Sequence, residues 1–253
     1  MKEVKVCLVG SGRAGMIHGH NLAGSVPGGK IIAVCDPVGN VAENAAKELG
    51  IDLFYKDYHD VMKNEEIDAV IIACPTKFHK EITVAAANAG KHVFCEKPMA
   101  MNEDECDEMI NAAKENNVKL QIGFMRRFDE SFQEAKRMIE AGEIGEVVSV
   151  KSHTRGPSKP KEWMYDISIS NGPLGEVCSH DIDTVRWFSG SEISSLYAVG
   201  GNYRNKEIAD QLEISTKNVE YHINNALKQL KCDLMQDYFT VAICILQFIW
   251  MKK

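Results

Sequence analysis

The chain has 253 residues and a net charge of −7, with 45% hydrophobic and 26% charged residues. This composition is typical of a folded globular protein, and the length suits one large domain or two smaller ones. An acidic chain has no general attraction for nucleic acid. No apolar run reaches the ~18 residues of a membrane-spanning helix. The first residues indicate a strand rather than a signal peptide, so we expect a cytoplasmic protein with no membrane partner.

Eight cysteines are present, without a CxxC pair and without Cys/His spacing for zinc. We therefore expect no metal site and interpret the thiols as buried hydrophobic groups. The acidic excess lies before residue 202, whereas residues 202–253 are nearly neutral. This difference in charge indicates two unlike parts of the chain.

Strand and helix patterns alternate over the first 123 residues. The predicted strands cover residues 4–9, 30–35, 68–73, 92–95 and 119–123. The predicted helices cover residues 13–24, 40–49, 81–89 and 104–116. This alternation indicates βαβ units, and hence a doubly wound parallel sheet with helices on both faces.

The regular alternation of strand and helix patterns ends after Gly123. We expect a helix over 129–141, a strand over 147–154, an irregular loop over 155–175, a helix over 181–188 and a short strand over 196–199. From residue 202 onward glycine and proline are absent, and helical periodicity predicts helices over 205–212 and 216–231. A strongly apolar segment follows at 237–250.

A glycine-rich turn joins the first strand to the first helix: Gly10-Ser11-Gly12-Arg13-Ala14-Gly15. Gly10 permits the tight turn, Gly12 lets the backbone approach a pyrophosphate, and Gly15 lets helix and strand pack closely. The helix N-terminus offers N–H groups and a partial positive charge to phosphates. The turn therefore predicts a dinucleotide site of the Rossmann kind, with Ala14 among its residues.

Asp36 stands at the end of the second predicted strand, about 20 residues after the glycine turn. Its carboxylate can accept hydrogen bonds from a ribose 2′-hydroxyl and would repel a 2′-phosphate, which favours NAD over NADP. Arg13 weakens this preference because a guanidinium can pair with phosphate. A plain turn residue before Pro37 is the alternative interpretation of Asp36.

Two further segments carry groups suited to proton transfer. Lys97, in Glu96-Lys97-Pro98, follows a strand end that should face the ligand crevice, where a lysine can bind a substrate hydroxyl. Glu176 and His180 lie four residues apart and share a face if their segment is helical. A neutral imidazole can take a hydroxyl proton while hydride leaves the same carbon. A surface lysine and a helix-capping charged segment are the simpler alternatives.

The ordered series of motifs resembles the glucose-fructose oxidoreductase/inositol dehydrogenase family, Gfo/Idh/MocA. Besides the glycine turn and Asp36, the matching segments lie at 71–79, 89–98, 123–128, 142–147 and 180–183. The resemblance runs from residue 1 to about 201. It implies a Rossmann domain followed by an α/β domain with an open antiparallel sheet through which oligomers form. It also implies NAD-linked hydride transfer at a hydroxyl-bearing carbon of a sugar, inositol or related polyol.

The family's catalytic Lys, Asp and His map onto Lys97, Glu176 and His180, so a glutamate stands where the family usually has aspartate. The extra methylene moves the carboxylate and can displace the imidazole. The resemblance also places a second group of residues at the cofactor: Pro75, His79, Glu96 and Lys97.

Residues 205–231 show two amphipathic stretches, with Ser215 as a natural N-cap between them. They resemble the DNA-binding region 4 of extracytoplasmic-function sigma factors and the related LuxR-type modules. By this likeness the groove-facing residues would be Thr216, Lys217, Asn218, Tyr221 and His222. An ordinary helical hairpin is the alternative.

We therefore expect a Rossmann domain over 1–123, a truncated α/β substrate domain over 124–201 and a helix-turn-helix-like helical tail over 202–253. A chimeric join near 201–205 is favoured over a natural fusion, because both parts look truncated there. The substrate domain lacks strands that the family usually has, and the helices that normally precede the helix-turn-helix are not recognisable. Three functions follow: an NAD-dependent oxidoreductase or its incomplete relic, a DNA-binding transcription regulator, and a non-catalytic dinucleotide-binding protein.

Overall fold

The computed structural model describes residues 3–154, 166–172 and 174–197. The chain divides into a first unit, residues 1–134 with 161–183, and a second unit, residues 135–160 with 184–253. The predicted helix-turn-helix lies outside the described residues, and so do its proposed DNA-facing residues. No helix among the described residues is long and apolar enough to cross a membrane.

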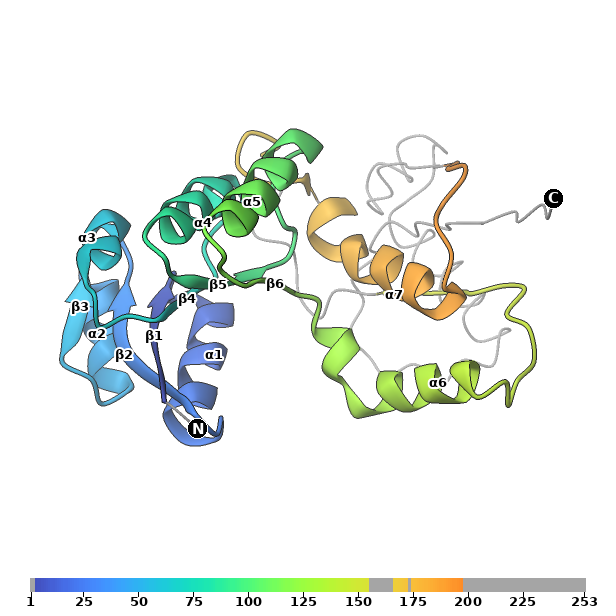
Figure 1. The fold of residues 1–253 in the computed structure, drawn as a ribbon, viewed down its shortest axis with the longest axis horizontal. Helices are drawn as coiled ribbons and strands as arrows, with labels where there is room; N and C mark the ends of the chain where they lie inside the picture. The colour runs from blue at the N-terminus through green and yellow to red at the C-terminus, as the bar shows by residue number, and fades with distance from the viewer. Residues whose placement is uncertain (1–2, 155–165, 173, 198–253) are drawn as a thin grey trace, which may run out of the picture. The chain divides into compact units, whose positions relative to one another are not determined.

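Six parallel strands form the sheet of the first unit, in the order β3-β2-β1-β4-β5-β6 (Figure 1). Their bounds are β1 Val4–Val9, β2 Gly29–Cys35, β3 Leu53–Tyr55, β4 Ala69–Ile72, β5 His92–Glu96 and β6 Leu120–Gly123. The strand order reverses between β1 and β4, which creates the switch point where doubly wound sheets bind ligands. The predicted Rossmann-type parallel sheet is confirmed.

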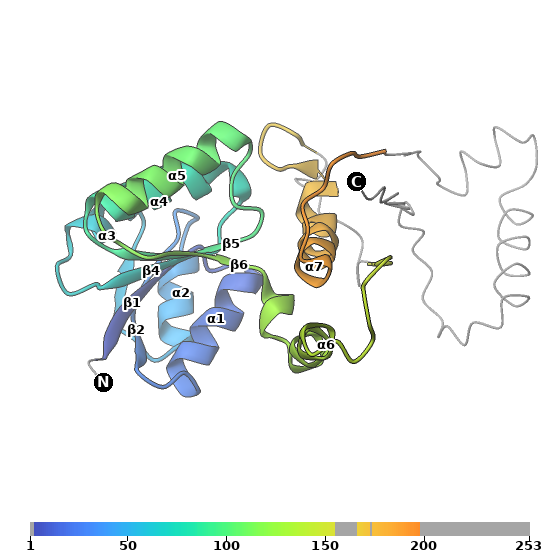
Figure 2. The same ribbon diagram turned by 45° about the vertical axis from the view of Figure 1, so that its right-hand side comes forward.

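Helices cover both faces of this sheet, with α1 and α2 on one face and α3, α4 and α5 on the other (Figure 2). Their bounds are α1 Arg13–Gly24, α2 Val41–Glu48, α3 Tyr58–Lys63, α4 His79–Asn88 and α5 Glu103–Glu115. Alternate residues of β1 enter two cores, since Leu8 packs with α2 and Cys7 packs with the opposite cluster. The strands are apolar on both sides because both faces are covered.

The described residues after β6 form helices and irregular segments. The helices are a short turn at Met125–Phe128, α6 Glu130–Glu140, a π-helical turn at Leu174–Cys178 and α7 Ser179–Ser189. The strand expected over 147–154 is not formed. A strand needs a neighbour to satisfy its backbone, and the described part of the chain holds no strand after Gly123. The expected α/β character of this region is therefore not confirmed.

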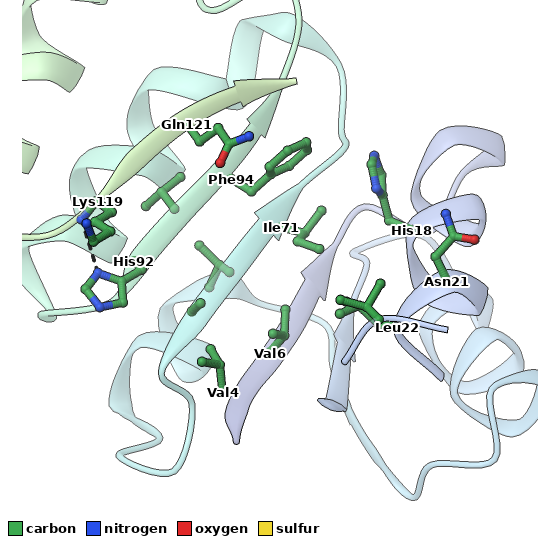
Figure 3. A pocket seen from close by; sticks show the side chains of 14 residues that line it. Val4, Val6, His18, Asn21, Leu22, Ile71, His92, Phe94, Lys119 and Gln121 are labelled. Carbon is green, nitrogen blue, oxygen red and sulfur yellow. Dashed lines mark hydrogen bonds between the residues drawn. The ribbon is translucent and has the colours of Figure 1, made fainter. Parts of the chain in front are cut away.

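A hollow of about 480 Å³ lies beside α1 on the sheet face that α1 and α2 cover (Figure 3). Val6, Ile71 and Phe94 form part of its apolar floor, and His18 and Leu22 of α1 form one wall. It lies over β1, β4, β5 and β6.

Lys91 is a buried cation that joins two segments of the first unit. Its side chain is 3% exposed, and Nζ donates hydrogen bonds to the carbonyl oxygens of Asn64 (2.7 Å) and Ile67 (3.0 Å). Burial lowers the pKa of its ammonium group. The two bonds hold the loop before β4 against the start of β5.

We expect Lys91→Met to lower the free energy of unfolding by about 1–3 kcal/mol, because the buried Ile67 carbonyl and the partly buried Asn64 carbonyl each lose the Lys91 hydrogen bond. Urea denaturation followed by circular dichroism measures this loss. The control is Lys47→Met, which removes an exposed pair with Glu43 and should change stability by less than about 1 kcal/mol. Equal losses in the two variants would contradict the structural role of Lys91.

Candidate active site

The glycine turn is packed so tightly that two of its glycines have no substitute. Gly10 has φ +91°, and a Cβ there would lie 2.7 Å from the backbone of Ala73 and Cys74. A Cβ on Gly15 would lie 1.9 Å from the carbonyl oxygen of Gly10. The turn and the close packing of α1 on β1 therefore have the geometry that the sequence predicts for these positions.

Gly12 is different, because a Cβ there would meet nothing within 4 Å. It is the N-cap of α1, no side chain caps the helix, and no acidic residue stands in the first turn. Arg13 and Ala14 are exposed beside it. The free N–H groups of this helix end, together with the open space over Gly12, fit the pyrophosphate of a dinucleotide.

Asp36 lies against the glycine turn. Its Oδ2 accepts hydrogen bonds from the backbone N–H (3.0 Å) and hydroxyl (3.1 Å) of Ser11, and its Oδ1 accepts one from the backbone N–H of Val38 (3.0 Å). The residue is 8% exposed. Each carboxylate oxygen has room for more than one donor, so Asp36 can stabilise the turn and still accept a bond from a ribose hydroxyl. This position fits NAD.

Pro75 and His79 lie beyond the end of β4, where Pro75 is exposed and begins a short 3₁₀ turn, Thr76–Phe78. His79 is 1% exposed, and its ring nitrogens lie 2.8 Å from the Pro98 carbonyl oxygen and 2.9 Å from that of Cys74. The predicted cofactor contact of His79 is therefore not supported, since main-chain acceptors occupy both nitrogens. Its ring joins the segments that follow β4 and β5.

Lys97 follows β5 and is half-buried. Its Nζ donates a hydrogen bond to the backbone carbonyl of Glu176, 2.6 Å away. Burial lowers the pKa of the ammonium group, against the opposing influence of the Glu176 and Glu96 carboxylates. A lowered pKa lets Lys97 exchange a proton more readily than a surface lysine.

Glu96 is paired with His18 of α1, with 2.7 Å between Oε1 and Nε2. Burial opposes the charged carboxylate, but the His18 hydrogen bond and the neighbouring Lys97 outweigh burial, and the pKa of Glu96 is lowered. Glu96 therefore carries a negative charge beside Lys97.

Glu176 is buried, and its carboxylate points to a different partner from the predicted one. Oε1 accepts hydrogen bonds from the Thr76 hydroxyl (2.8 Å) and the backbone N–H of Asn171 (3.2 Å). The structure thus gives this carboxylate bonds to Thr76 and Asn171, and its predicted orientation of His180 stays a prediction. Glu176 stands in a π-helical turn, Leu174–Cys178, that precedes α7.

His180 lies in the first turn of α7. Burial lowers the pKa of its imidazole to about 4, and the positive charges of Lys97 and Arg126 act in the same direction, against Glu96 and Asp181. The ring is therefore neutral between pH 5 and 8 and can accept a proton. The structure thus brings Lys97 and the main chain of Glu176 together, with His180 in the field of Lys97.

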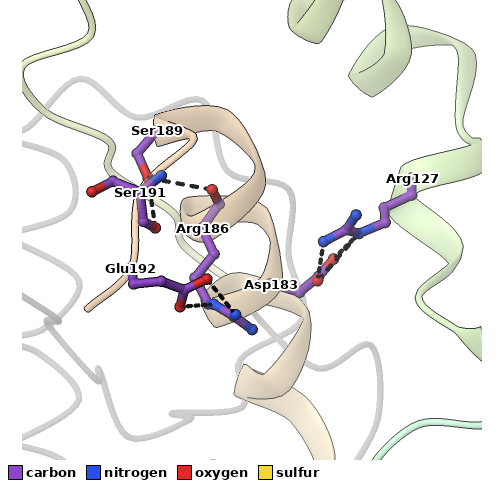
Figure 4. Close-up of polar contacts among 6 residues, drawn as sticks. All are labelled: Arg127, Asp183, Arg186, Ser189, Ser191 and Glu192. Carbon is purple, nitrogen blue, oxygen red and sulfur yellow. Dashed lines mark hydrogen bonds and ion pairs between the residues drawn. The ribbon is translucent and has the colours of Figure 1, made fainter.

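The sequence analysis did not predict two ion pairs that lie close to His180 in the chain. Arg126 Nη1 lies 2.8 Å from Asp181 Oδ1. Arg127 binds both carboxylate oxygens of Asp183 through one edge of its guanidinium, with Nε 2.9 Å from Oδ2 and Nη2 2.8 Å from Oδ1 (Figure 4). The motif segments 123–128 and 180–183 were recognised, but their pairing across more than 50 residues leaves no local signal.

Two family models match the chain. One, described as "Oxidoreductase family, NAD-binding Rossmann fold", matches residues 4–124, and the other, "GFO/IDH/MocA C-terminal domain", matches residues 132–227. The second match continues through the predicted join at 201–205 and into the predicted helix-turn-helix. The comparisons therefore do not support a chimeric join or a DNA-binding tail.

The chain is similar to enzymes that act on inositols. It is 40% identical to a scyllo-inositol 2-dehydrogenase (NAD(+)) of Bacillus subtilis over 78% of this chain and 57% of that protein. It is 32% identical to a myo-inositol 2-dehydrogenase of Thermotoga maritima over 84% of this chain and 63% of that protein. A solved scyllo-inositol dehydrogenase of Lactobacillus casei, with NAD(H) and scyllo-inositol bound, has 34% identity and a TM-score of 0.69 over 80% of this chain and 61% of that one. The chain spans less than two thirds of the length of these relatives.

The glycine turn yields a matched pair of variants. Gly12→Ala should leave the melting temperature nearly unchanged but weaken NADH binding at least ~10-fold, because the new methyl group enters the open space at the helix N-terminus. Gly15→Ala should destabilise the fold, since its methyl group overlaps the carbonyl of Gly10. Thermal melts and calorimetric titration with NADH separate the two effects. Tight NADH binding by Gly12→Ala would place the pyrophosphate elsewhere.

Proposed function

Because the chain belongs to the Gfo/Idh/MocA oxidoreductase family, we propose that it is an NAD-dependent dehydrogenase for an inositol or a related polyol. The observation that carries the proposal is the group at the carboxyl edge of the sheet. A helix N-terminus open to phosphate follows β1, a half-buried lysine follows β5, and a neutral histidine stands in the first turn of α7.

The cofactor residues in this proposal come from the ends of β1, β2, β4 and β5. The backbone of Gly12, Arg13 and Ala14 holds the pyrophosphate, and Asp36 binds the adenosine ribose. Pro75 and Glu96 border the cofactor at the ends of β4 and β5. NAD, when bound, supplies the carbon that accepts the hydride.

Proton transfer falls to His180 and Lys97. The neutral imidazole of His180 accepts the proton of the substrate hydroxyl while hydride leaves the carbon. Lys97 uses one of its three donors on the Glu176 carbonyl and has two others for the substrate oxygen. Glu176 acts through this carbonyl, while its carboxylate ties the turn to Thr76.

The substrate class rests on the named relatives, which act on inositols. In this proposal residues 1–123 form the NAD domain and residues 124–201 belong to the substrate domain. We take forward no DNA-binding function, because no observation favours it.

Cofactor preference tests the first half of the proposal. NADH should bind more tightly than NADPH, because Asp36 would repel a 2′-phosphate. Calorimetric titration of the whole chain with each cofactor measures the difference. The absence of NADH binding at millimolar concentration would remove the proposal.

Turnover tests the second half. His180→Asn should lower kcat/KM for NAD-dependent oxidation of scyllo- or myo-inositol by about 10²–10⁴-fold, the usual contribution of a general base. Its affinity for NADH should stay close to that of the parent chain. For the parent chain, kcat/KM should rise with pH through about 4, since protonated His180 cannot accept a second proton. An unchanged rate in His180→Asn would assign the base elsewhere.

A further inference from the structure

The turn that carries His180 is held from two neighbouring strands. β5 and β6 are paired in register, with Glu96 opposite Gly123. The residue after β5 is Lys97, which binds the Glu176 carbonyl. Just beyond β6, the turn Met125–Phe128 carries Arg126, which binds Asp181. Two cationic side chains thus join this edge of the sheet to the π-helical turn before α7 and to the first turn of α7.

The Arg126–Asp181 pair is more buried than an ordinary surface ion pair. The exposed fractions of the two side chains are 17% and 7%. The Arg126 guanidinium also lies over the ring of Phe132, 5.5 Å from its centroid, which restricts its orientation. A buried carboxylate that loses its partner is strongly destabilised. Asp181, next to His180 in the chain, is therefore firmly held.

We infer that the ion pair between Arg126 and Asp181 positions His180 for proton transfer, an inference that rests on the proposed dehydrogenase function. Arg126 and Asp181 act as positioning residues. The pair fixes the position of the His180 imidazole relative to Lys97. Lys97 and Arg126 both lie at the same edge of the sheet.

The same pair gives His180 a distinctive electrostatic signature. Burial has the largest influence on the pKa of its imidazole and lowers it. Lys97 and Arg126 also lower this pKa, whereas Glu96 and Asp181 raise it. The two members of one ion pair therefore act in opposite directions. A purely structural role would make loss of either member act in the same direction.

A neighbouring ion pair serves as a matched control. Arg127 follows Arg126 in the chain, and Asp183 lies two residues after Asp181. The contacts between Arg127 and Asp183 are as short as the contact between Arg126 and Asp181 (Figure 4). The charges with the largest influence on the pKa of His180 are those of Lys97, Arg126, Glu96 and Asp181, and not those of this second pair. Loss of this pair should loosen the start of α7 without moving the titration of His180.

The experiment is an NMR titration of ring-labelled histidines in the full chain, with His180 assigned from the His180→Asn variant. Circular dichroism at each pH confirms that the chain stays folded. Arg126→Gln should raise the titration midpoint of His180 and Asp181→Asn should lower it, each by roughly half a pH unit or more. Arg126→Lys keeps the charge and should leave the midpoint close to that of the parent. Arg127→Gln and Asp183→Asn should also leave it unchanged.

A kinetic measurement tests positioning directly. Arg126→Gln and Asp181→Asn should each lower kcat for inositol oxidation at least ~10-fold at pH 8, with little change in KM for NAD, because a displaced base loses its alignment. Arg126→Lys should recover part of that loss.

Opposite movements of the midpoint together with lower kcat support the inference. Movement of both midpoints in one direction, no movement, or parent-like kcat in both variants overturns it. If the parent chain binds NADH but oxidises no polyol, the proposed function fails, and the inference about proton transfer fails with it. In that case the titration still shows whether the ion pair sets the charge of His180.

Discussion

All six strands of the sheet run in one direction, and this constraint brings the candidate site together. Parallel strands place their carboxyl ends at one edge, so residues far apart in the chain meet there. Gly10 follows β1, Asp36 follows β2, Lys97 follows β5 and Arg126 lies just beyond β6. The contact of Gly10 with the backbone after β4 shows how closely these ends approach. A side chain on Gly10 would separate β1 from β4 at the point where the order of the strands reverses.

Burial has the largest single influence on the pKa values of Lys97 and His180 at this edge. Desolvation lowers the pKa of both Lys97 and His180. The positive charges of Lys97 and Arg126 also lower the pKa of His180. Glu96 keeps a negative charge nearby through its bond with His18. The result is a neutral base beside a cation, which is the combination needed to remove a proton from a hydroxyl group and bind the oxygen that remains.

Local signals made the Rossmann sheet and the glycine turn predictable, because strand pattern, turn and helix follow one another within short segments. The strand β3 and the helix α3 were missed, since three and six residues are too short for a clear periodicity. The strand over 147–154 was wrong because pairing partners decide whether an alternating segment becomes a strand.

The proposed catalytic side chains show the same division. Lys97 and His180 were proposed from their motifs, but residue spacing does not indicate that the Glu176 carboxylate bonds to Thr76 and Asn171. The acceptors of His79 are main-chain carbonyls, which the sequence does not show. The Arg126–Asp181 contact joins segments 55 residues apart, and no local pattern reports such a distance.

The bond between Asp36 and Ser11 has a consequence for the energetics of ligand association. The carboxylate accepts hydrogen bonds from both the backbone N–H and the hydroxyl of Ser11, so contacts within the protein fix the shape of the glycine turn. A preorganised loop loses little conformational entropy when a ligand docks. More of the free energy of the phosphate contacts then appears as affinity.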